Sequence, residues 1–189
     1  MKILIYGSKE FAATVSELAR HCGHEIIGMI DDLNTGPSIL GGLDIVAQKY
    51  SPQEYGVAIA VGYNNLAARW AVWKRIKAFG YYAPALIHPR AYVADTANVG
   101  EGIMVMAGAI VDVRAMLGDL VVVWPGVCVN HDSKIGTNTF LSPSATVCGA
   151  AIVGSHVFVG AGSVIVDHGK VPDGKFIKAA SCYARGRVL

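Results

Sequence analysis

Residues 117–135 read LGDLVVVWPGVCVNHDSKI, and an aliphatic residue recurs in this stretch at every sixth place. The same spacing continues without a gap over fifteen positions: Ile87, Val93, Val99, Val105, Val111, Leu117, Val123, Val129, Ile135, Leu141, Val147, Val153, Val159, Ile165 and Val171. Val, Ile and Leu make up 50 of the 189 residues, so chance alone would fill only about a quarter of these positions. A repeat of fixed length indicates stacked equivalent units rather than an irregular globular core.

Each aliphatic position is counted here as the first place of a hexad. The fifth place is nearly as regular, because Ala, Ser, Thr or Val fills most of these positions: Ala91, Ala97, Ala109, Ala115, Val121, Val127, Ser133, Thr139, Ala145, Ala151, Val157 and Ser163. Since side chains alternate between the two faces of a straight strand, the first, third and fifth places would share one face. The third place instead holds residues that prefer turns or water, such as Pro89, Asp95, Asp119, Pro125 and His131.

The hexads therefore predict one backbone bend each, with the first and fifth places inside and the third place outside. Glycine recurs at positions 100, 118, 136 and 154, which is a spacing of three hexads. Three short straight segments joined by three bends make one triangular coil of 18 residues. The region from Ile87 to Phe176 then gives five coils, and the sequence predicts a parallel β-helix.

Composition excludes several classes of protein. The net charge of +2 and the pI of about 8.3 do not suggest a nucleic-acid or membrane-surface binder. No stretch approaches the roughly 20 apolar residues of a membrane-spanning helix, and the N-terminus lacks the apolar core of a signal peptide. The four cysteines are widely spaced and form no metal-binding motif, so we expect reduced thiols and a cytoplasmic protein.

The first third of the chain alternates predicted strands with predicted helices. We expect strands over 2–6, 25–30 and 57–61, a helix over 10–22 that ends before Gly23, and a helix over 65–79 capped by Asn64. This order predicts a small parallel sheet of the α/β class. Ligands bind beyond the carboxyl ends of the strands in such sheets, where this chain places Gly7, Ser8, Asp31 and Asp32. From the residues alone, an equally good interpretation is that Gly7 marks a tight turn and that Asp31 and Asp32 are solvated surface acids.

The two regions together resemble a known family. The hexads are similar to those of left-handed β-helix (hexapeptide-repeat) acyltransferases. The order of domains resembles the N-acetyltransferases of nucleotide-linked amino sugars and the sialic acid O-acetyltransferases. Local matches are the strand ending at Gly7, the Asp31-Asp32 pair, the segment 62–69, Leu86-Ile-His-Pro89 and Val171-Pro-Asp-Gly174.

The resemblance implies a nucleotide-sugar-binding α/β domain, Rossmann-like, over 1–86 and a left-handed β-helix acyltransferase domain over 87–189. It implies acetyl-CoA as co-substrate, a nucleotide-linked sugar as acceptor, a homotrimer, and a role in bacterial surface glycan (polysaccharide) synthesis. By the same resemblance, Gly7, Ser8, Asp31 and Asp32 would bind the nucleotide.

His131, followed by Asp132, matches the family position of the catalytic base and its acidic helper. Acyl transfer needs a base with a pKa near neutrality, and a carboxylate can orient the ring. Without the resemblance, a surface histidine beside an acid would have no assigned role. The resemblance also implies that Gly149, Ala161 and Ala179 line the CoA site, with phosphate contacts from Lys175, Lys178, Arg185 and Arg187, although a solvated basic tail is equally compatible with the residues.

Three departures from the family pattern leave alternatives open. Trp124 and Phe140 stand where relatives often have Asn and His, and Glu10-Phe11 replaces a Gly-His pair in the first loop. The alternatives are O-acetylation of a sugar such as sialic acid, or a non-catalytic nucleotide-binding or assembly protein. No metal site is expected, because no three histidines have suitable ligand positions.

Overall fold

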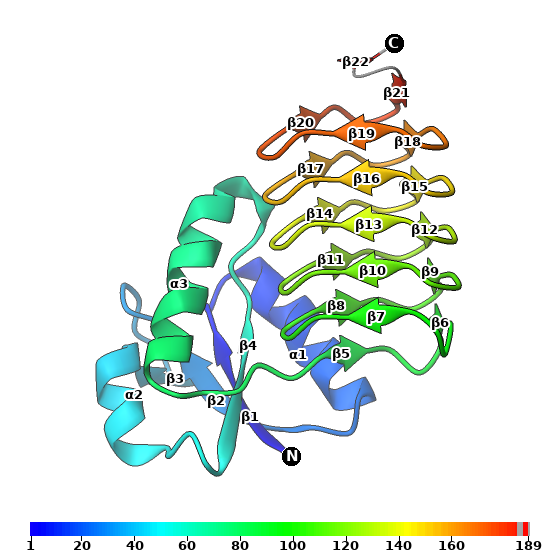
Figure 1. Cartoon of the computed structure of the whole chain (residues 1–189). Helices are drawn as coiled ribbons and strands as arrows, with labels where there is room; N and C mark the ends of the chain where they lie inside the picture. Colours follow the sequence, from blue (N-terminus) through cyan, green and yellow to red (C-terminus); the bar gives the residue numbers. More distant parts are fainter. Residues whose placement is uncertain (185–186, 189) are drawn as a thin grey trace. The chain divides into compact units, whose positions relative to one another are not determined.

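The structure is a computed structural model that describes residues 1–184 and 187–188. The chain divides into two compact units, Met1–Leu86 and Ile87–Leu189. Each unit has its own hydrophobic core, and each is considered by itself below (Figure 1).

The first unit is a four-stranded parallel sheet with helices, in the strand order β3-β2-β1-β4. Its elements are β1 (Lys2–Tyr6), α1 (Glu10–His21), β2 (Glu25–Ile30), β3 (Ile39–Gly41), α2 (Leu43–Lys49), β4 (Tyr55–Ile59), a 3-10 turn η1 (Tyr63–Asn65) and α3 (Leu66–Ala78). Residues 3–5 of β1 are fully buried, as expected for a central strand of a parallel sheet, which is covered on both faces. The predicted α/β class is confirmed.

Two details differ from the sequence-based prediction. The side chain that caps α3 is that of Asn65, whose Oδ1 accepts a hydrogen bond from the Ala68 amide at 2.8 Å, so the prediction of Asn64 was wrong. Strand β3 and helix α2 were not predicted, because the segment between Leu33 and Gly56 is short, polar at its start and without a clear period.

The second unit is a solenoid of two-residue strands in parallel register (Figure 1). The strands are β5 (Leu86–Ile87), β6 (Tyr92–Val93), β7 (Asn98–Val99), β8 (Met104–Val105), β9 (Ile110–Val111), β10 (Met116–Leu117), β11 (Val122–Val123), β12 (Cys128–Val129), β13 (Lys134–Ile135), β14 (Phe140–Leu141), β15 (Thr146–Val147), β16 (Ile152–Val153), β17 (Phe158–Val159), β18 (Val164–Ile165), β19 (Lys170–Val171), β20 (Phe176–Ile177), β21 (Cys182–Ala184) and β22 (Arg187–Val188).

Every third strand pairs, so three sheets run along the solenoid, with the orders β19-β16-β13-β10-β7, β20-β17-β14-β11-β8-β5 and β22-β21-β18-β15-β12-β9-β6. Within each of these sheets up to β21, paired residues are 18 positions apart, as in Val129↔Val147 and Leu117↔Ile135. The predicted parallel β-helix is confirmed, and its coils wind in the left-handed sense (Figure 1).

The bend of each hexad lies at the fourth place, where the backbone enters the left-handed region. From Gly102 to Ala180 every fourth place has a φ between 53° and 71°, and nine of these residues are not glycine: Arg114, Leu120, Asp132, Asn138, Ser144, Ala150, His156, His168 and Ala180. Such a φ is unfavourable for residues with a Cβ. The bend amides compensate by donating to the preceding coil, as Asp132 does to the Val113 carbonyl at 3.1 Å.

Burial follows the predicted pattern of inside and outside places. All first places from Val105 to Val171 are buried, and the third places are exposed or half-buried except Gly149. The glycine column is explained by the close approach of successive coils: a Cβ on Gly136 would lie 2.5 Å from the backbone nitrogen of Ser155.

The inward stack can be tested with two neighbouring residues of β16. Val153 is 1% exposed and Ile152 is 42% exposed, so Val153→Asp buries an unpaired carboxylate while Ile152→Asp places it in water. We expect Val153→Asp to lose several kcal/mol of stability and to fail to fold, and Ile152→Asp to keep the fold. Circular dichroism with thermal melting measures both, and equal melting temperatures would contradict the inward stack.

Candidate functional site

His131 and Asp132 lie at the bend that follows β12. The imidazole Nδ1 of His131 is 2.9 Å from Oδ2 of Asp132. Because an ionised carboxylate can only accept, Nδ1 donates and Nε2 is left as the proton acceptor. The side chain of His131 is 55% exposed, so this nitrogen is within reach of a bound molecule. The structure therefore brings the two predicted catalytic residues together in the geometry of an oriented base.

Arg114 is a third member of this group, and the sequence analysis missed it. Its Nε and Nη2 atoms are 2.7 and 2.8 Å from Oδ1 and Oδ2 of Asp132. The hydrogen bond from Arg114, together with that from His131, holds the pKa of the Asp132 carboxyl well below its usual range. Arg114 stands 18 residues before Asp132, and this spacing of one coil is the signal that could have identified it.

Gly149 lies one coil above His131, and the imidazole reaches up to lie next to it. A Cβ added to Gly149 would be 2.7 Å from both Cε1 and Nε2 of His131. Asp167 flanks the same position, with Oδ1 3.4 Å from that Cβ. Glycine at 149 therefore leaves the space that the His131 ring occupies.

The other histidines make different contacts. His156 faces the Asn138 amide at 2.9 Å, His21 pairs with Glu17 in α1, and Nδ1 of His88 accepts from the Arg90 amide. Burial, and the nearby N-terminal charge, lower the pKa of His24. Among the histidines, His131 combines exposure at an outward bend with a carboxylate on its Nδ1.

The residues expected to line the CoA site do not all lie on one corner of the solenoid. Gly149 follows β15, whereas Ala161 and Ala179 follow β17 and β20, which belong to another sheet. Both alanines are exposed, and so are Lys175 and Lys178. Arg185 lies outside the described residues, and for Arg187 only the backbone is described. Within one chain the structure thus separates Gly149 from Ala161 and Ala179.

Trp124 and Phe140, the two aromatic residues that depart from the family pattern, also lie away from His131 within the chain. Trp124 and Phe140 have ring centroids 6.0 Å apart, and the contacts continue through Phe158 to Phe176. These rings form an aromatic ladder along the sheet of β11, β14, β17 and β20, while His131 follows β12 of a different sheet. Ring stacking accounts for aromatic residues at these places without a role beside the base of the same chain.

In the first unit, the carboxyl ends of β1 and β2 bring the predicted nucleotide-binding residues together. The Gly7 amide donates to the Ile30 carbonyl at 2.8 Å, and the Ser8 hydroxyl donates to Oδ2 of Asp31. Oδ1 of Asp31 accepts from the amides of Leu33 and Asn34. Burial opposes ionisation of Asp31, but these hydrogen bonds outweigh it and lower its pKa to about 2. The Asp31 carboxylate therefore connects the loop that follows β1 with the loop that follows β2 through hydrogen bonds.

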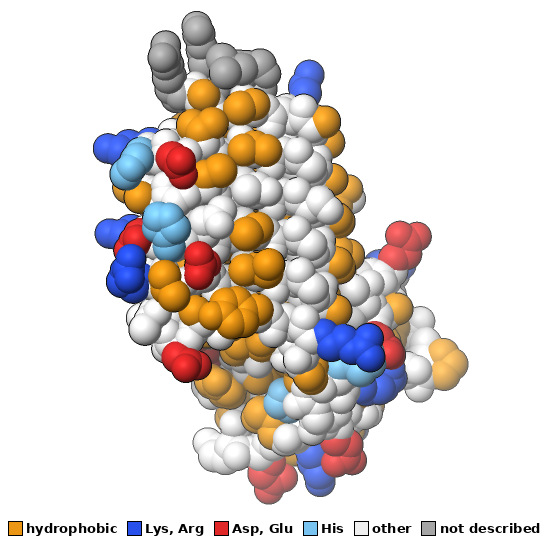
Figure 2. Space-filling view, turned by 90° about the vertical axis from the view of Figure 1, so that its right-hand side faces the viewer, with side chains coloured by type: hydrophobic (Ala, Val, Ile, Leu, Met, Phe, Trp, Pro, Cys, Tyr) orange, Lys and Arg blue, Asp and Glu red, His pale blue; other side chains and the backbone are white. Residues whose placement is uncertain are grey.

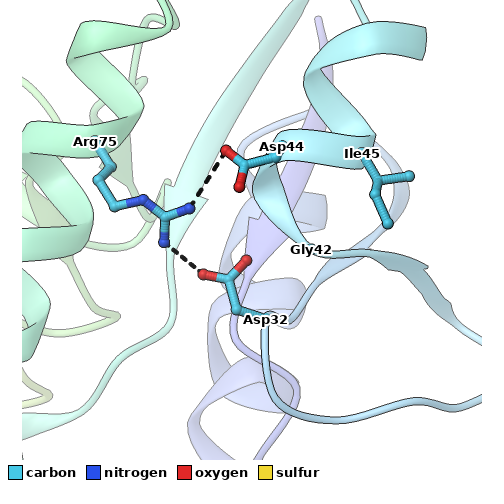
Figure 3. Close-up of a pocket in the computed structure, with 5 residues that line it drawn as sticks. All are labelled: Asp32, Gly42, Asp44, Ile45 and Arg75. Carbon is cyan, nitrogen blue, oxygen red and sulfur yellow. Dashed lines mark hydrogen bonds and ion pairs between the residues drawn. The ribbon is translucent and has the colours of Figure 1, made fainter.

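Asp32 lines a cavity beside Asp31. The cavity has a volume of about 410 Å³ and is lined by Asp32, Gly42, Asp44, Ile45 and Arg75 (Figure 3). Arg75 reaches from α3 to Oδ2 of Asp32 at 2.6 Å and to Asp44 at 3.6 Å.

Asp32 also accepts hydrogen bonds from the Tyr6 hydroxyl and from the amide of Leu43, the first residue of α2. Burial opposes its ionisation, but these bonds and the one from Arg75 lower the pKa of Asp32. Sequence reasoning missed Arg75, because its distance of 43 residues from Asp32 gives no local signal.

Residues 1–184 and 187–188 contain no group of three or more His, Cys, Asp or Glu side chains placed to hold a metal ion. Over the same residues, no helix has the length and apolar character needed to cross a membrane.

Comparison with known proteins gives matches for both units. Residues 2–76 match the family model of the PglD N-terminal domain. The acetyltransferase domain of PglB from Neisseria gonorrhoeae, in complex with acetyl coenzyme A, matches with a TM-score of 0.78 and 28% identity over 100% of this chain and 98% of that chain. No curated protein sequence matches.

Two further solved structures share the fold over the whole chain. A mutant of perosamine N-acetyltransferase from Caulobacter crescentus, in complex with CoA and GDP-perosamine, has a TM-score of 0.79 and 23% identity over 100% of this chain and 97% of that chain. WeeI from Acinetobacter baumannii has a TM-score of 0.57 and 18% identity, with 100% of both chains covered.

The space above His131 can be tested with Gly149→Ala. The added methyl group would collide with the imidazole, which is the mobile end of a side chain, so we expect the fold to persist and the ring to turn away from Asp132. A crystal structure of the variant, or the nitrogen chemical shifts of His131, measures the loss of the Nδ1 hydrogen bond. A ring that stays bonded to Asp132 in the variant would contradict this description of the site.

Proposed function

We propose that this chain, which belongs to the left-handed β-helix sugar acetyltransferases, transfers the acetyl group of acetyl-CoA to the amino group of a nucleotide-linked sugar. The single observation that carries the proposal is the His131–Asp132 pair. It stands at an outward bend of a solenoid that matches an acetyltransferase with bound acetyl coenzyme A over its whole length.

The reaction follows from the free Nε2 of His131. As the amino nitrogen attacks the thioester carbonyl, a nitrogen–carbon bond forms and Nε2 takes the proton that the amine loses. Asp132 keeps Nδ1 protonated and stabilises the imidazolium that forms. When the carbon–sulfur bond breaks, the imidazolium can return the proton to the CoA thiolate. The oxyanion of the intermediate is assigned to a backbone amide.

The nucleotide of the acceptor is assigned to the first unit, at Gly7, Ser8, Asp31 and Asp32. Backbone amides between β1 and α1 suit phosphate. Oδ1 of Asp32, which accepts one hydrogen bond from the Leu43 amide, retains an acceptor position for a ribose or a base. The hydrogen bonds of Asp31 to Ser8, Leu33 and Asn34 support the proposal, because they fix the loop before the ligand arrives. The neighbouring cavity beside Arg75 offers space of the size of a nucleotide fragment.

We assign CoA to Gly149, Ala161 and Ala179, and this assignment requires more than one chain. Because Gly149 and the two alanines lie on different corners of the solenoid, one cofactor could meet all three only between two solenoids. A homotrimer would place the Gly149 corner of one protomer beside Ala161 of the partner subunit.

The outer face of the sheet β6-β9-β12-β15-β18 suits such an assembly. Apolar side chains gather along this side of the solenoid (Figure 2), and Tyr92, Ile110 and Val164 are 56%, 42% and 36% exposed. Cys128 and Thr146 stand between Ile110 and Val164 in this column, and exposed apolar side chains along one face are typical of protein interfaces. We also propose a cytoplasmic reaction that supplies bacterial surface polysaccharide synthesis; the four free cysteines agree with a reducing compartment.

The role of His131 is tested by turnover. His131→Ala should lower kcat by roughly 10²–10⁴-fold, the usual contribution of a positioned base, with little change in the affinity for acetyl-CoA. Asp132→Asn should cost less, because the base itself remains. Near-wild-type turnover in His131→Ala would sink the assignment and favour a non-catalytic role.

The nucleotide site is tested by thermal stability. A ligand at 100 times its dissociation constant adds about 2.7 kcal/mol to the stability of the state that binds it. We expect UDP, GDP or dTDP at millimolar concentration to raise the melting temperature, and Ser8→Ala to reduce this shift. Ser51→Ala, a half-buried serine of the same unit whose hydroxyl bonds to Gln53, is the control. If no nucleotide produces a shift, the first unit does not bind the acceptor in this way.

The trimer is tested by sedimentation. Ile110→Arg places a charge on the proposed interface, whereas Met116→Arg places it on the face of another sheet, where Met116 is 48% exposed. We expect the wild type and Met116→Arg to sediment as trimers and Ile110→Arg to dissociate. A monomeric wild type would contradict the shared cofactor site.

A further inference from the structure

Arg114 and Asp132 occupy the same place in successive coils. Both stand at fourth places with nearly equal φ angles of 57° and 60°. Each backbone is fixed by the coil below, since the Asp132 amide donates to the Val113 carbonyl at 3.1 Å and the Arg114 amide to the Thr96 hydroxyl at 3.2 Å. The two side chains therefore leave equivalent backbones one coil apart, which brings the guanidinium onto the carboxylate.

The guanidinium binds both oxygens of this carboxylate. Two parallel hydrogen bonds of 2.7 and 2.8 Å form the fork geometry that only arginine provides. Oδ2 accepts from Arg114 and from Nδ1 of His131 at the same time. Since the Asp132 side chain is 40% exposed, little else holds its rotamer against water. Arg114 therefore fixes the direction in which Asp132 presents Oδ2 to the imidazole.

The charge of Arg114 opposes that of the carboxylates around the ring. Asp112 lies near Arg114 in the coil below His131. Asp167 lies beside Gly149 and the Cys148 thiol, and His168 follows it in the chain. Carboxylates stabilise the protonated imidazole, whereas a base must start the reaction neutral. The guanidinium opposes part of this effect, because its positive charge is bound to the same carboxylate that bonds to the ring.

We propose that Arg114 is a positioning residue that aligns the Asp132 carboxylate with His131 and limits how strongly that carboxylate stabilises protonated His131. The role in catalysis rests on the proposed acetyl transfer, but the effect on the titration of His131 does not. The titration can therefore be measured on the free protein, and a failure of the proposed function would be distinguishable from a failure of this inference.

The first experiment is an NMR titration of the His131 ring in the full-length chain. Removing the positive charge in Arg114→Gln should raise the pKa of His131 by roughly half a unit, as expected for a nearby unit charge in water-like surroundings. Arg114→Lys keeps the charge and should leave the pKa close to that of the wild type. Arg90→Gln, an exposed arginine at the fourth place of another corner, removes the same charge and should not change it. An unchanged pKa in Arg114→Gln would overturn the proposed effect of its charge.

The second experiment separates orientation from charge in the kinetics. Arg114→Lys should lower kcat several-fold at the pH optimum with KM for acetyl-CoA unchanged, because the fork is lost while the charge remains. In Arg114→Gln the acidic limb of the pH profile should also move to higher pH. The loss of kcat in Arg114→Lys should disappear in an Asp132→Asn background, because Arg114 orients the imidazole through that carboxylate. Equal losses with and without Asp132, or wild-type kcat in both Arg114 variants, would overturn the proposed role.

Discussion

The 18-residue register of the solenoid is the constraint on which the rest of the second unit depends. Because paired strands are in parallel register, a residue meets the residues 18 places before and after it on the same corner. The proposed site is built from such contacts. Arg114 meets Asp132, and His131 lies over Gly149, one coil above. The same rule pairs Asn138 with His156 on another corner, so the repeat generates columns of neighbours throughout.

Some of the bends that close the coils also hold polar side chains outward, as at Arg114 and Asp132. Asp132 has a left-handed φ of 60°, and it could not both continue a strand and direct its carboxylate at the preceding residue. The unfavourable backbone at this bend is compensated by its hydrogen bond to the coil below and by the rigid aliphatic stack beneath it. The proposed catalytic geometry therefore rests on rigid backbone rather than on a flexible loop, which is what a positioned base requires.

Much of this could be predicted from the sequence, since the hexad spacing encodes the inward stack and Asp132 follows His131 directly. In the first unit, β1, β2, β4, α1, α3 and the carboxyl-edge residues were also predictable, because short apolar runs and glycine stops mark them, whereas β3 and α2 were not predicted. The contacts of Arg114 and Arg75 were not predicted either. Arg114 belongs to no local motif and contacts Asp132 only because successive coils stack. Arg75 contacts Asp32, which is 43 residues away in the sequence. The separation of Gly149 from Ala161 and Ala179 likewise required knowing which sheet each corner follows.

The central claim is that an amino group of a nucleotide-linked sugar receives the acetyl group of acetyl-CoA at His131. The most direct measurement is mass spectrometry of a panel of UDP-, GDP- and dTDP-linked amino sugars, with their hydroxyl analogues and sialic acid, after incubation with the protein and acetyl-CoA. The account predicts a mass gain of one acetyl group on one class of amino sugar, dependent on the protein and absent from its hydroxyl analogue. Acetylation of a hydroxyl alone, or of no sugar in the panel while CoA still binds, would contradict it.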